Sequence, residues 1–330
     1  MKRVLAIIIA AAFAIGSLAA CGNRSAEEGS AAKGTGAPEK LQIVTTIFPI
    51  YDWVQNILGE NAPHAEVTML LDNGVDLHSY QPTVEDIMKI STCDLFVYVG
   101  GESDAWVSDA LEEAVNPDMV VVNLLELLGD SVKEEVLKEG MQEDKHEHEE
   151  DAEYDEHVWL SLRNAEVLCE KIEQALEEID PDCADIYQKN LESYNGKLQA
   201  LDAEYEAVVS KASVKTLLFG DRFPFRYLVD DYGLDYFAAF VGCSAETEAS
   251  FETITFLAGK VDELSLHTVL TIEGGDGRIA ETIVQTSKAK DAKVLSLNSM
   301  QSVTAKDVQA GGTYLSMMEE NLKVLEEALK

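Results

Sequence analysis

Short apolar runs alternate with amphipathic stretches in the part of the chain that follows residue 40. Each run is rich in aliphatic and β-branched residues and has the length of a strand buried on both faces of a parallel sheet. These runs are residues 41–47, 66–71, 95–99 and 119–123. Helical patterns lie between them, at residues 51–58, 84–89 and 104–115. Strand and helix in alternation predict a doubly wound α/β lobe, which we place at residues 41–165.

The same alternation returns near the end of the chain. Its four apolar runs are residues 215–219, 234–240, 268–273 and 293–297. Helical patterns accompany them at residues 251–260, 279–289 and 314–329. We therefore expect a second lobe over residues 213–330. The predicted fold class is α/β, with two lobes that each contain a four-stranded parallel sheet flanked by helices.

The segment between the lobes, residues 166–212, has only helical character. One helix is expected over residues 164–178, and a second over residues 181–212 because no proline interrupts it. Apolar side chains in the second helix recur at alternating steps of four and three residues, at Tyr187, Leu191, Tyr194, Leu198, Leu201, Tyr205 and Val208. Such a stripe fits either a coiled-coil partner or packing against both lobes. We expect the latter, with one long rigid helix joining the lobes.

Residues 1–20 have the pattern of a secretory signal peptide: a basic start, an apolar stretch too short for a membrane span, and small residues at the end. The sequence Leu-Ala-Ala-Cys that ends at Cys21 resembles a bacterial lipobox, so Cys21 is expected to become the first residue and to carry lipid. An ordinary signal peptide, in which Cys21 is incidental, is the alternative. Residues 21–40 are rich in Gly, Ser and Ala and predict a flexible, lipid-anchored tether outside the cell membrane.

Acidic residues dominate the composition, since 61 Asp and Glu against 25 Lys and Arg give a formal charge of −36. A chain this acidic is not expected to bind nucleic acid, whereas its field attracts cations. The acidic residues concentrate in a predicted loop, residues 141–157, which also contains His146 and His148. We expect these two histidines to capture metal loosely. A merely solvated acidic loop is the alternative.

Two other histidines lie in predicted loops of the first lobe. His78 follows the strand predicted at residues 66–71, and His157 closes the acidic loop. Ligands of open α/β sheets bind beyond the carboxyl ends of the strands. A lone histidine at such a position is more often a surface residue than a ligand. Two imidazoles from separate loops, however, are the donors that a zinc or manganese site needs.

Four segments together resemble the zinc- and manganese-binding lipoproteins of bacterial ABC importers. They are residues 73–83 (NGVDLHSYQPT), residues 100–106 (GGESDAW), the histidine-rich loop and residues 155–160 (DEHVWL). The resemblance covers the whole chain after the signal peptide. It implies a two-lobed extracytoplasmic receptor that holds a metal ion in its cleft with two ligands from each lobe, and that has an ABC permease as its partner. His78 and His157 match the ligands of the first lobe, and the histidine-rich loop is characteristic of the zinc-selective branch.

The second lobe departs from the pattern of this family. Arg222 falls where the family has a His or Glu ligand, and a guanidinium has no lone pair to offer a metal. Its neighbour Asp221 has a carboxylate, so we expect His78, His157 and Asp221 to bind Zn²⁺, with Mn²⁺ as the alternative ion. Three further candidate ligands are Glu248, Glu273 and Asn298. For each of these three, a structural or surface role is the alternative.

Four cysteines follow Cys21, and none of them lies in a Cys-x-x-Cys motif: Cys93, Cys169, Cys183 and Cys243. Export permits disulfides, but the sequence does not choose among the pairings. We expect free, buried thiols. The spacing supports neither a thiolate zinc site nor a thioredoxin-like centre.

The expected function is that of a monomeric, lipid-anchored receptor that captures Zn²⁺ and delivers it to the permease. Arg222 and Asn298 leave open a metal-free or altered-ligand receptor or adhesin on the same fold. A zinc hydrolase is also open, because two histidines and a carboxylate with a vacant position describe catalytic zinc as well. The chain has no His-Glu-x-x-His run and no glycine elbow around a serine, so we do not expect an enzyme.

Overall fold

The computed structural model describes residues 40–59, 64–142, 154–244 and 248–330. The predicted signal peptide, Cys21 and nearly all of the tether lie outside these residues, as do His146 and His148. Within the described part of the chain, no helix combines the length and the apolarity that a membrane crossing requires.

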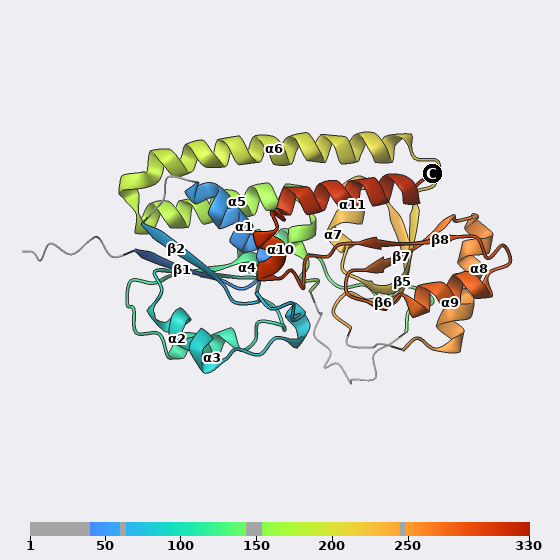
Figure 1. Cartoon of the computed structure of the whole chain (residues 1–330), viewed down its shortest axis with the longest axis horizontal. Coiled ribbons are helices and arrows are strands. Elements are labelled where there is room, and N and C mark those ends of the chain that lie inside the picture. The colour runs from blue at the N-terminus through green and yellow to red at the C-terminus, as the bar shows by residue number, and fades with distance from the viewer. Residues whose placement is uncertain (1–39, 60–63, 143–153, 245–247) are drawn as a thin grey trace, which may run out of the picture. The chain divides into compact units, whose positions relative to one another are not determined.

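Four parallel strands form the sheet of the first lobe, in the order β2-β1-β3-β4. Figure 1 shows β1 and β2 of this sheet side by side. Their bounds are β1 (Leu41–Thr45), β2 (Ala65–Met69), β3 (Leu95–Tyr98) and β4 (Val120–Asn123). The helices of this lobe are α1 (Phe48–Leu58), α2 (Val84–Thr92), α3 (Val107–Glu112) and α4 (Leu124–Leu128). Because the strands are parallel, all four carboxyl ends lie at one edge of the sheet, where open α/β sheets bind ligands.

The second lobe repeats this arrangement, with four parallel strands in the order β6-β5-β7-β8. Their bounds are β5 (Thr216–Phe223), β6 (Asp235–Val241), β7 (Thr268–Ile272) and β8 (Lys293–Leu297). The helices are α7 (Arg226–Tyr232), α8 (Phe251–Leu264), α9 (Arg278–Thr286), α10 (Ala305–Gln309) and α11 (Tyr314–Ala328). The predicted fold class is therefore confirmed, and β6 holds the same edge position in its sheet as β2 does in the first.

Two long helices, α5 (Leu162–Ile179) and α6 (Ala184–Lys211), connect the lobes. α6 packs against α1 and α5 and also against α7 and α11. Its Tyr194 hydroxyl donates a hydrogen bond to Asp52 of α1 at 3.3 Å, and its Tyr205 hydroxyl donates one to the Met318 carbonyl of α11 at 2.6 Å. α6 therefore packs along both lobes rather than leaving its apolar stripe for another chain.

The elements differ from the predicted ones in a few places, each with a local cause. The predicted helix at residues 104–115 is shorter as α3, because Asp104 accepts hydrogen bonds from the backbone nitrogens of Val99 and Gly100 at 2.9 and 3.0 Å and so belongs to the preceding loop. The stripe on α6 ends at buried Val209 rather than at half-buried Val208. The short helices α4, α7 and α10 were not expected, since none is long enough to show a helical period.

None of the four described cysteines forms a disulfide, which confirms the expectation of free thiols. Cys93 and Cys169 are buried in the core, as expected. Cys183 and Cys243 are only half-buried, so the expectation of burial is wrong for these two. Both lie in turns where elements end, Cys183 between α5 and α6 and Cys243 after β6.

Candidate metal centre

His78 lies in a single helical turn, η1 (Leu77–Ser79), beyond the carboxyl end of β2. Asp76 caps this turn, because its Oδ1 accepts a hydrogen bond from the His78 backbone nitrogen at 3.0 Å. The imidazole Nδ1 of His78 lies 2.7 Å from the Ser103 hydroxyl and 3.7 Å from Oε2 of Glu156. These contacts on Nδ1 leave Nε2 of His78 directed at the second histidine.

His157 is completely buried and stands at the start of the turn η3 (Val158–Leu160). Its Nδ1 lies 3.0 Å from Oδ1 of Asp155, the same oxygen that accepts from the His157 backbone nitrogen at 2.9 Å. A carboxylate on Nδ1 fixes the tautomer in which Nε2 keeps its lone pair, as in many metal-binding histidines. His157 is therefore oriented for coordination through Nε2.

The second lobe holds the loop of His157 in place. The Tyr227 hydroxyl of α7 donates a hydrogen bond to the Asp155 carbonyl at 2.8 Å. The Trp159 indole donates to the Ser299 carbonyl at 2.8 Å, and the Tyr314 hydroxyl of α11 donates to the Trp159 carbonyl at 2.7 Å. This segment of the first lobe therefore sits in a cradle of second-lobe side chains.

The two imidazole rings are tilted by 60° to each other and approach through their Nε2 atoms, which are 3.1 Å apart. Two zinc–nitrogen bonds of about 2.0–2.1 Å at a tetrahedral angle would separate these nitrogens by about 3.3 Å. Burial, followed by the facing His157, lowers the pKa of His78 below its ordinary value and so favours the neutral imidazole. Burial also works against a proton on His157, but Asp155 beside it outweighs this and raises the pKa of His157.

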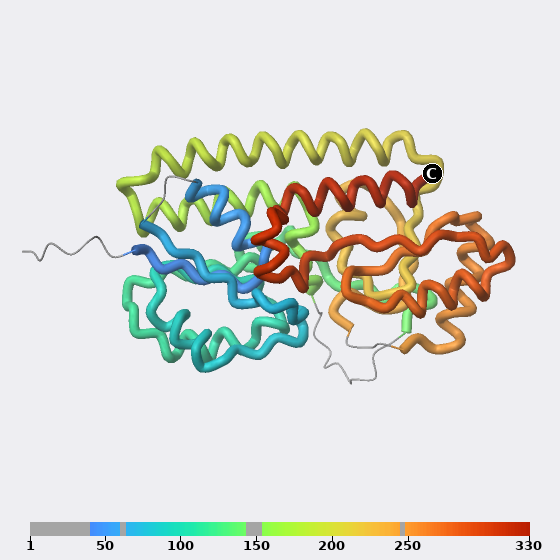
Figure 2. Tube along the Cα trace, viewed as in Figure 1, coloured from blue at the N-terminus to red at the C-terminus, as the bar shows by residue number. Residues whose placement is uncertain are grey.

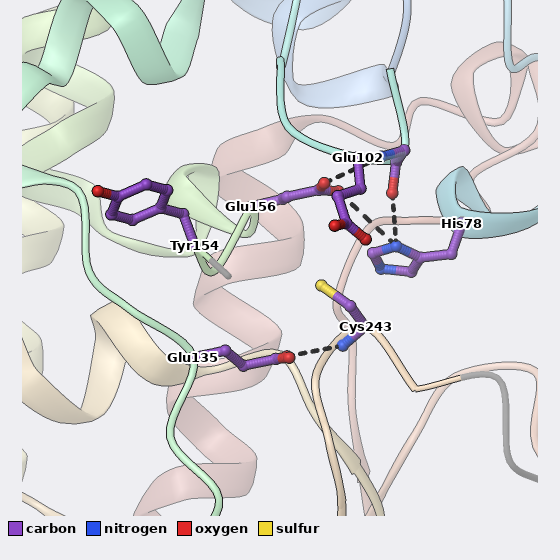
Figure 3. A pocket seen from close by; sticks show the side chains of 7 residues that line it. His78, Glu102, Glu135, Tyr154, Glu156 and Cys243 are labelled. Carbon is purple, nitrogen blue, oxygen red and sulfur yellow. Dashed lines mark hydrogen bonds and ion pairs between the residues drawn. The ribbon is translucent and has the colours of Figure 1, made fainter. Parts of the chain in front are cut away.

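Cys243 supplies a third donor, and the sequence analysis did not anticipate it. The ligating atoms of His78, His157 and Cys243 all lie within 4.8 Å of one another, and Figure 3 shows Cys243 next to His78. The Cys243 backbone nitrogen donates to Oε1 of Glu135 at 2.9 Å, which anchors the turn. Burial raises the pKa of the Cys243 thiol well above its usual range, so a metal ion bound there has to displace a proton.

Glycine makes this approach between the lobes feasible. A Cβ atom added at Gly242 would lie 3.0 Å from the His157 ring and 3.0 Å from the Phe223 carbonyl. In the first lobe, Gly101 has a φ of +82°, and an added Cβ would lie 2.3 Å from Oε1 of Glu156. A side chain at either position would push the loops of the centre apart.

A cavity of about 220 Å³ opens next to the three donors. Besides His78 and Cys243, it is lined by Glu102, Ser103, Glu135, Tyr154 and Glu156. Glu156 is nearly buried, its Oε2 accepts no hydrogen bond among the described residues, and burial raises its pKa. Two imidazoles, a thiol and an unsatisfied carboxylate oxygen make up a donor set that suits Zn²⁺.

Asp221, the expected carboxylate ligand, is used elsewhere. Its Oδ2 accepts from the Ile272 backbone nitrogen at 3.2 Å, and its Oδ1 accepts from the Arg222 backbone nitrogen at 2.9 Å. It lines a separate cavity of about 610 Å³ and does not belong to the group formed by His78, His157 and Cys243. The structure therefore brings together the two predicted histidines but not Asp221.

Arg222 is paired across the lobes. Its guanidinium donates to Oδ2 of Asp76 at 2.7 Å, so the carboxylate that caps the turn of His78 also binds the second lobe.

The three further candidates have structural contacts. Glu273 accepts hydrogen bonds from the Ser299 nitrogen at 2.6 Å and the Ser299 hydroxyl at 2.7 Å. Oδ1 of Asn298 accepts from the Met300 backbone nitrogen at 2.8 Å. Glu248 is exposed, and its carbonyl accepts from Gln142 at 3.2 Å. Glu273 and Asn298 thus build the turn after β8.

A signal for Cys243 was present in the sequence. It follows the strand expected at residues 234–240, just as His78 follows the strand expected at residues 66–71. The rule that ligands bind beyond carboxyl ends of strands applies to both positions. Cys243 was not predicted as a ligand because it lies in no Cys-x-x-Cys motif. Its partners in the group come from the other lobe.

Comparisons with known proteins show which proteins this chain is similar to. The family described as zinc-uptake complex component A, periplasmic, matches residues 43–328. The zinc-binding lipoprotein AdcA of Streptococcus pneumoniae is 32% identical over 99% of this chain, which spans only 61% of that relative. The high-affinity zinc uptake system protein ZnuA of Bacillus subtilis is 30% identical, over 98% of this chain and 96% of the relative.

Solved structures give the same result. The Zn(II)-bound ZnuA-like domain of Streptococcus pneumoniae AdcA matches with a TM-score of 0.69 and 30% identity, covering 88% of this chain and 99% of that domain. A mutant of the laminin-binding adhesin Lmb of Streptococcus agalactiae matches with a TM-score of 0.70 and 25% identity, covering 88% of this chain and all of the adhesin chain. With a family match over nearly all of its described residues, the chain belongs to the family of the periplasmic zinc-uptake component A.

Proposed function

We propose that this protein is an extracytoplasmic receptor that captures Zn²⁺ between its lobes and delivers it to an ABC permease. The observation that carries the proposal is the meeting of two first-lobe imidazoles, those of His78 and His157, with the second-lobe thiol of Cys243 within 4.8 Å. The names of the relatives, a zinc-binding lipoprotein and a zinc uptake protein, support zinc as the cargo.

The donor chemistry favours zinc over manganese. Thiolate is a soft ligand that suits Zn²⁺, whereas Mn²⁺ prefers carboxylate, carbonyl and water oxygens. Two neutral imidazoles leave the ion with its full double charge, and the Cys243 thiolate offsets part of this charge. The acidic wall formed by Glu102, Glu135 and Glu156 offsets more and offers a fourth ligand. Cys243 thus takes the role that we had expected for Asp221.

Capture in this arrangement depends on contact between the lobes. Zinc bound by both lobes gains all its ligands only while the turn after β6 stays against His157. α6 packs along both lobes, so movement of the turns around the site, rather than wide opening of the lobes, is the proposed route of release.

The anchor and the partner follow from the family. Lipidation of Cys21 is supported by the Leu-Ala-Ala-Cys sequence and by the lipoprotein name of the streptococcal relative. The permease partner is supported by the zinc-uptake description of the family. The relatives compared above are named as zinc-binding, zinc-uptake or adhesin proteins, which favours a receptor over a hydrolase.

Competition for zinc against a chromophoric chelator tests the proposal in chains that carry Cys21→Ala, which keeps them free of lipid. The parent chain should hold one zinc ion tightly, and His157→Ala should lose that tight site. Exposed His267→Ala is the matched control and should bind like the parent. A parent chain that does not compete with the chelator would leave the metal-free receptor or adhesin as the better interpretation.

A further inference from the structure

We infer that the first lobe contains a second metal site, formed by His64, Asp180 and Cys183. His64 lies just before β2, and Asp180 and Cys183 lie in the turn between α5 and α6. Figure 2 lets the reader follow the chain into this turn, and a contact of 2.8 Å between His64 Nε2 and Asp180 Oδ2 places the segments side by side. The chemistry of the three side chains suits Zn²⁺ or a similar divalent transition metal.

The donor atoms have nearly the spacing of a tetrahedral zinc site. Cys183 Sγ is 3.6 Å from His64 Nε2, and all three donor atoms lie within 4.8 Å of one another. A zinc–nitrogen bond of about 2.0–2.1 Å and a zinc–sulfur bond of about 2.3 Å at a tetrahedral angle put nitrogen and sulfur about 3.6 Å apart. The Asp180 oxygen has to move outward by about half an ångström to give a zinc-bound separation from the nitrogen.

The surroundings hold the ligands while leaving an ion room to enter. The Tyr187 hydroxyl donates to Oδ2 of Asp180 at 2.6 Å and so orients the carboxylate. The side chains of His64 and Asp180 are 30% and 15% exposed, so water can reach the group and fill a fourth position. An ion here would be held less tightly than in the first centre, because it competes with the contact between His64 and Asp180.

The distribution of thiols supports the inference independently. Cys93 and Cys169 are buried in the core, and neither belongs to a metal-competent group among the described residues. The two half-buried cysteines, Cys183 and Cys243, each lie beside histidine, and these are the two groups of described residues with metal-ligand spacing. Both cysteines outside the core are therefore placed where their thiols can share a metal ion with an imidazole.

The second site is distinct from the first centre in position. His64 precedes β2 and His78 follows it, so the two groups lie toward opposite ends of this strand. The five residues of β2 separate the two ends by about 16 Å. Metal at the second site would tie the start of β2 to the turn between α5 and α6, so the second equivalent should stabilise the first lobe.

Cobalt absorption tests the inference, because Co²⁺ bound to thiolate has a near-ultraviolet charge-transfer band. All chains carry Cys21→Ala, so the thiols of the folded part are the only ones present, and the histidine-rich loop contributes no thiol. The chain with Cys243→Ser reports the second site alone. It should show a saturable band with one equivalent of Co²⁺, and adding Cys183→Ser should abolish that band.

His64→Ala in the Cys243→Ser chain should raise the cobalt concentration for half-saturation by about tenfold or more, whereas exposed His267→Ala should leave it unchanged. Absence of the band in the Cys243→Ser chain, or a band that survives Cys183→Ser, would overturn the second site. The chain with Cys183→Ser alone reports the first centre, so failure of the proposed receptor site is seen separately. Circular dichroism of each variant verifies folding.

Discussion

The two lobes share one sheet order but contribute to the proposed metal centre in different ways. His78 follows β2 and Cys243 follows β6, and these are the equivalent edge strands of the two sheets. The first lobe adds His157, which Asp155 orients and which second-lobe hydrogen bonds hold. In the second lobe, the nearby carboxylates of Asp221 and Glu273 accept hydrogen bonds from backbone nitrogens of the same lobe.

This difference shows that the sheet topology and the identity of the ligands are determined separately. A parallel sheet decides where a side chain can reach the cleft, namely beyond the carboxyl end of a strand. It does not decide which residue type stands there. A thiol beyond the equivalent strand of the second sheet keeps a donor at the cleft. Nearby, Arg222 joins the lobes through its hydrogen bond to Asp76.

The largest effect on zinc affinity is expected from the first lobe. His157→Ala removes a buried ligand whose orientation Asp155 fixes, and the surrounding hydrogen bonds prevent another donor from moving in. Loss of an oriented ligand should exceed the 10–100-fold effect typical of second-shell changes, so we expect a loss of more than about a hundredfold. Chelator competition measures it, with melting temperature as the control for folding. Affinity equal to the parent would remove His157 from the centre.

The next largest effect is expected from the second-lobe thiol. Cys243→Ser replaces a thiolate by a neutral hydroxyl, and we expect zinc affinity to fall by roughly 10–100-fold and cadmium affinity to fall further, because Cd²⁺ is softer. Isothermal titration with both ions measures this. Cys183→Ser is the matched control and should leave the tight site unchanged. A Cys243→Ser chain with parental affinity would show that the second lobe supplies some other ligand.

A smaller effect is expected from the contact that joins the half-sites. Arg222→Ala removes the hydrogen bond to Asp76 but leaves the Asp76 cap on the turn of His78. We expect zinc affinity to fall by about tenfold or less, because positioning is lost while every ligand remains. Competition titration measures it, with exposed Arg278→Ala as the control. A gain in affinity would mean that the positive charge of Arg222 repels the ion more than its contact positions the site.

The fold was largely predictable from the sequence. The strands are short, apolar and separated by helical patterns, so periodicity locates them without knowledge of tertiary contacts. The helical segment between the lobes was also predictable, because its apolar stripe recurs on one face. The late start of α3, at Val107 rather than at residue 104, was not, since the side chain of Asp104 binds the backbone nitrogens of Val99 and Gly100. A contact of this kind depends on a loop conformation that periodicity does not encode.

The first half of the site was predictable and the second was not. His78 and His157 stand out because two imidazoles from separate loops of one lobe are the donors that a zinc site needs. Cys243 was not recognised because its partner ligands come from the other lobe. Gly242 lets the turn of Cys243 pack closely against His157, but a single glycine forms no recognisable sequence motif. Asp221 was predicted as a ligand because it has a carboxylate next to Arg222. Its contact with the backbone nitrogen of Ile272, 51 residues away in the sequence, was not predictable.

The smallest effect on zinc affinity is expected at Asp221 itself. Its Oδ2 accepts from the Ile272 nitrogen of β7, and its Oδ1 accepts from the Arg222 nitrogen, so both oxygens serve the backbone. Asp221→Asn keeps one acceptor and replaces the other by a donor that faces the Ile272 nitrogen. Loss of that one hydrogen bond should lower the free energy of unfolding by about 1 kcal/mol.

Zinc affinity of Asp221→Asn should stay within about twofold of the parent, since no ligand changes, and second-shell losses begin at about tenfold. Urea unfolding measures the first quantity and chelator competition the second. Asn298→Ala is the companion variant: it removes the oxygen that caps the Met300 nitrogen and should also bind zinc normally. A fall in zinc affinity for Asp221→Asn as large as that for Cys243→Ser would show that Asp221 is a ligand after all. The second lobe would then contribute a carboxylate to the site.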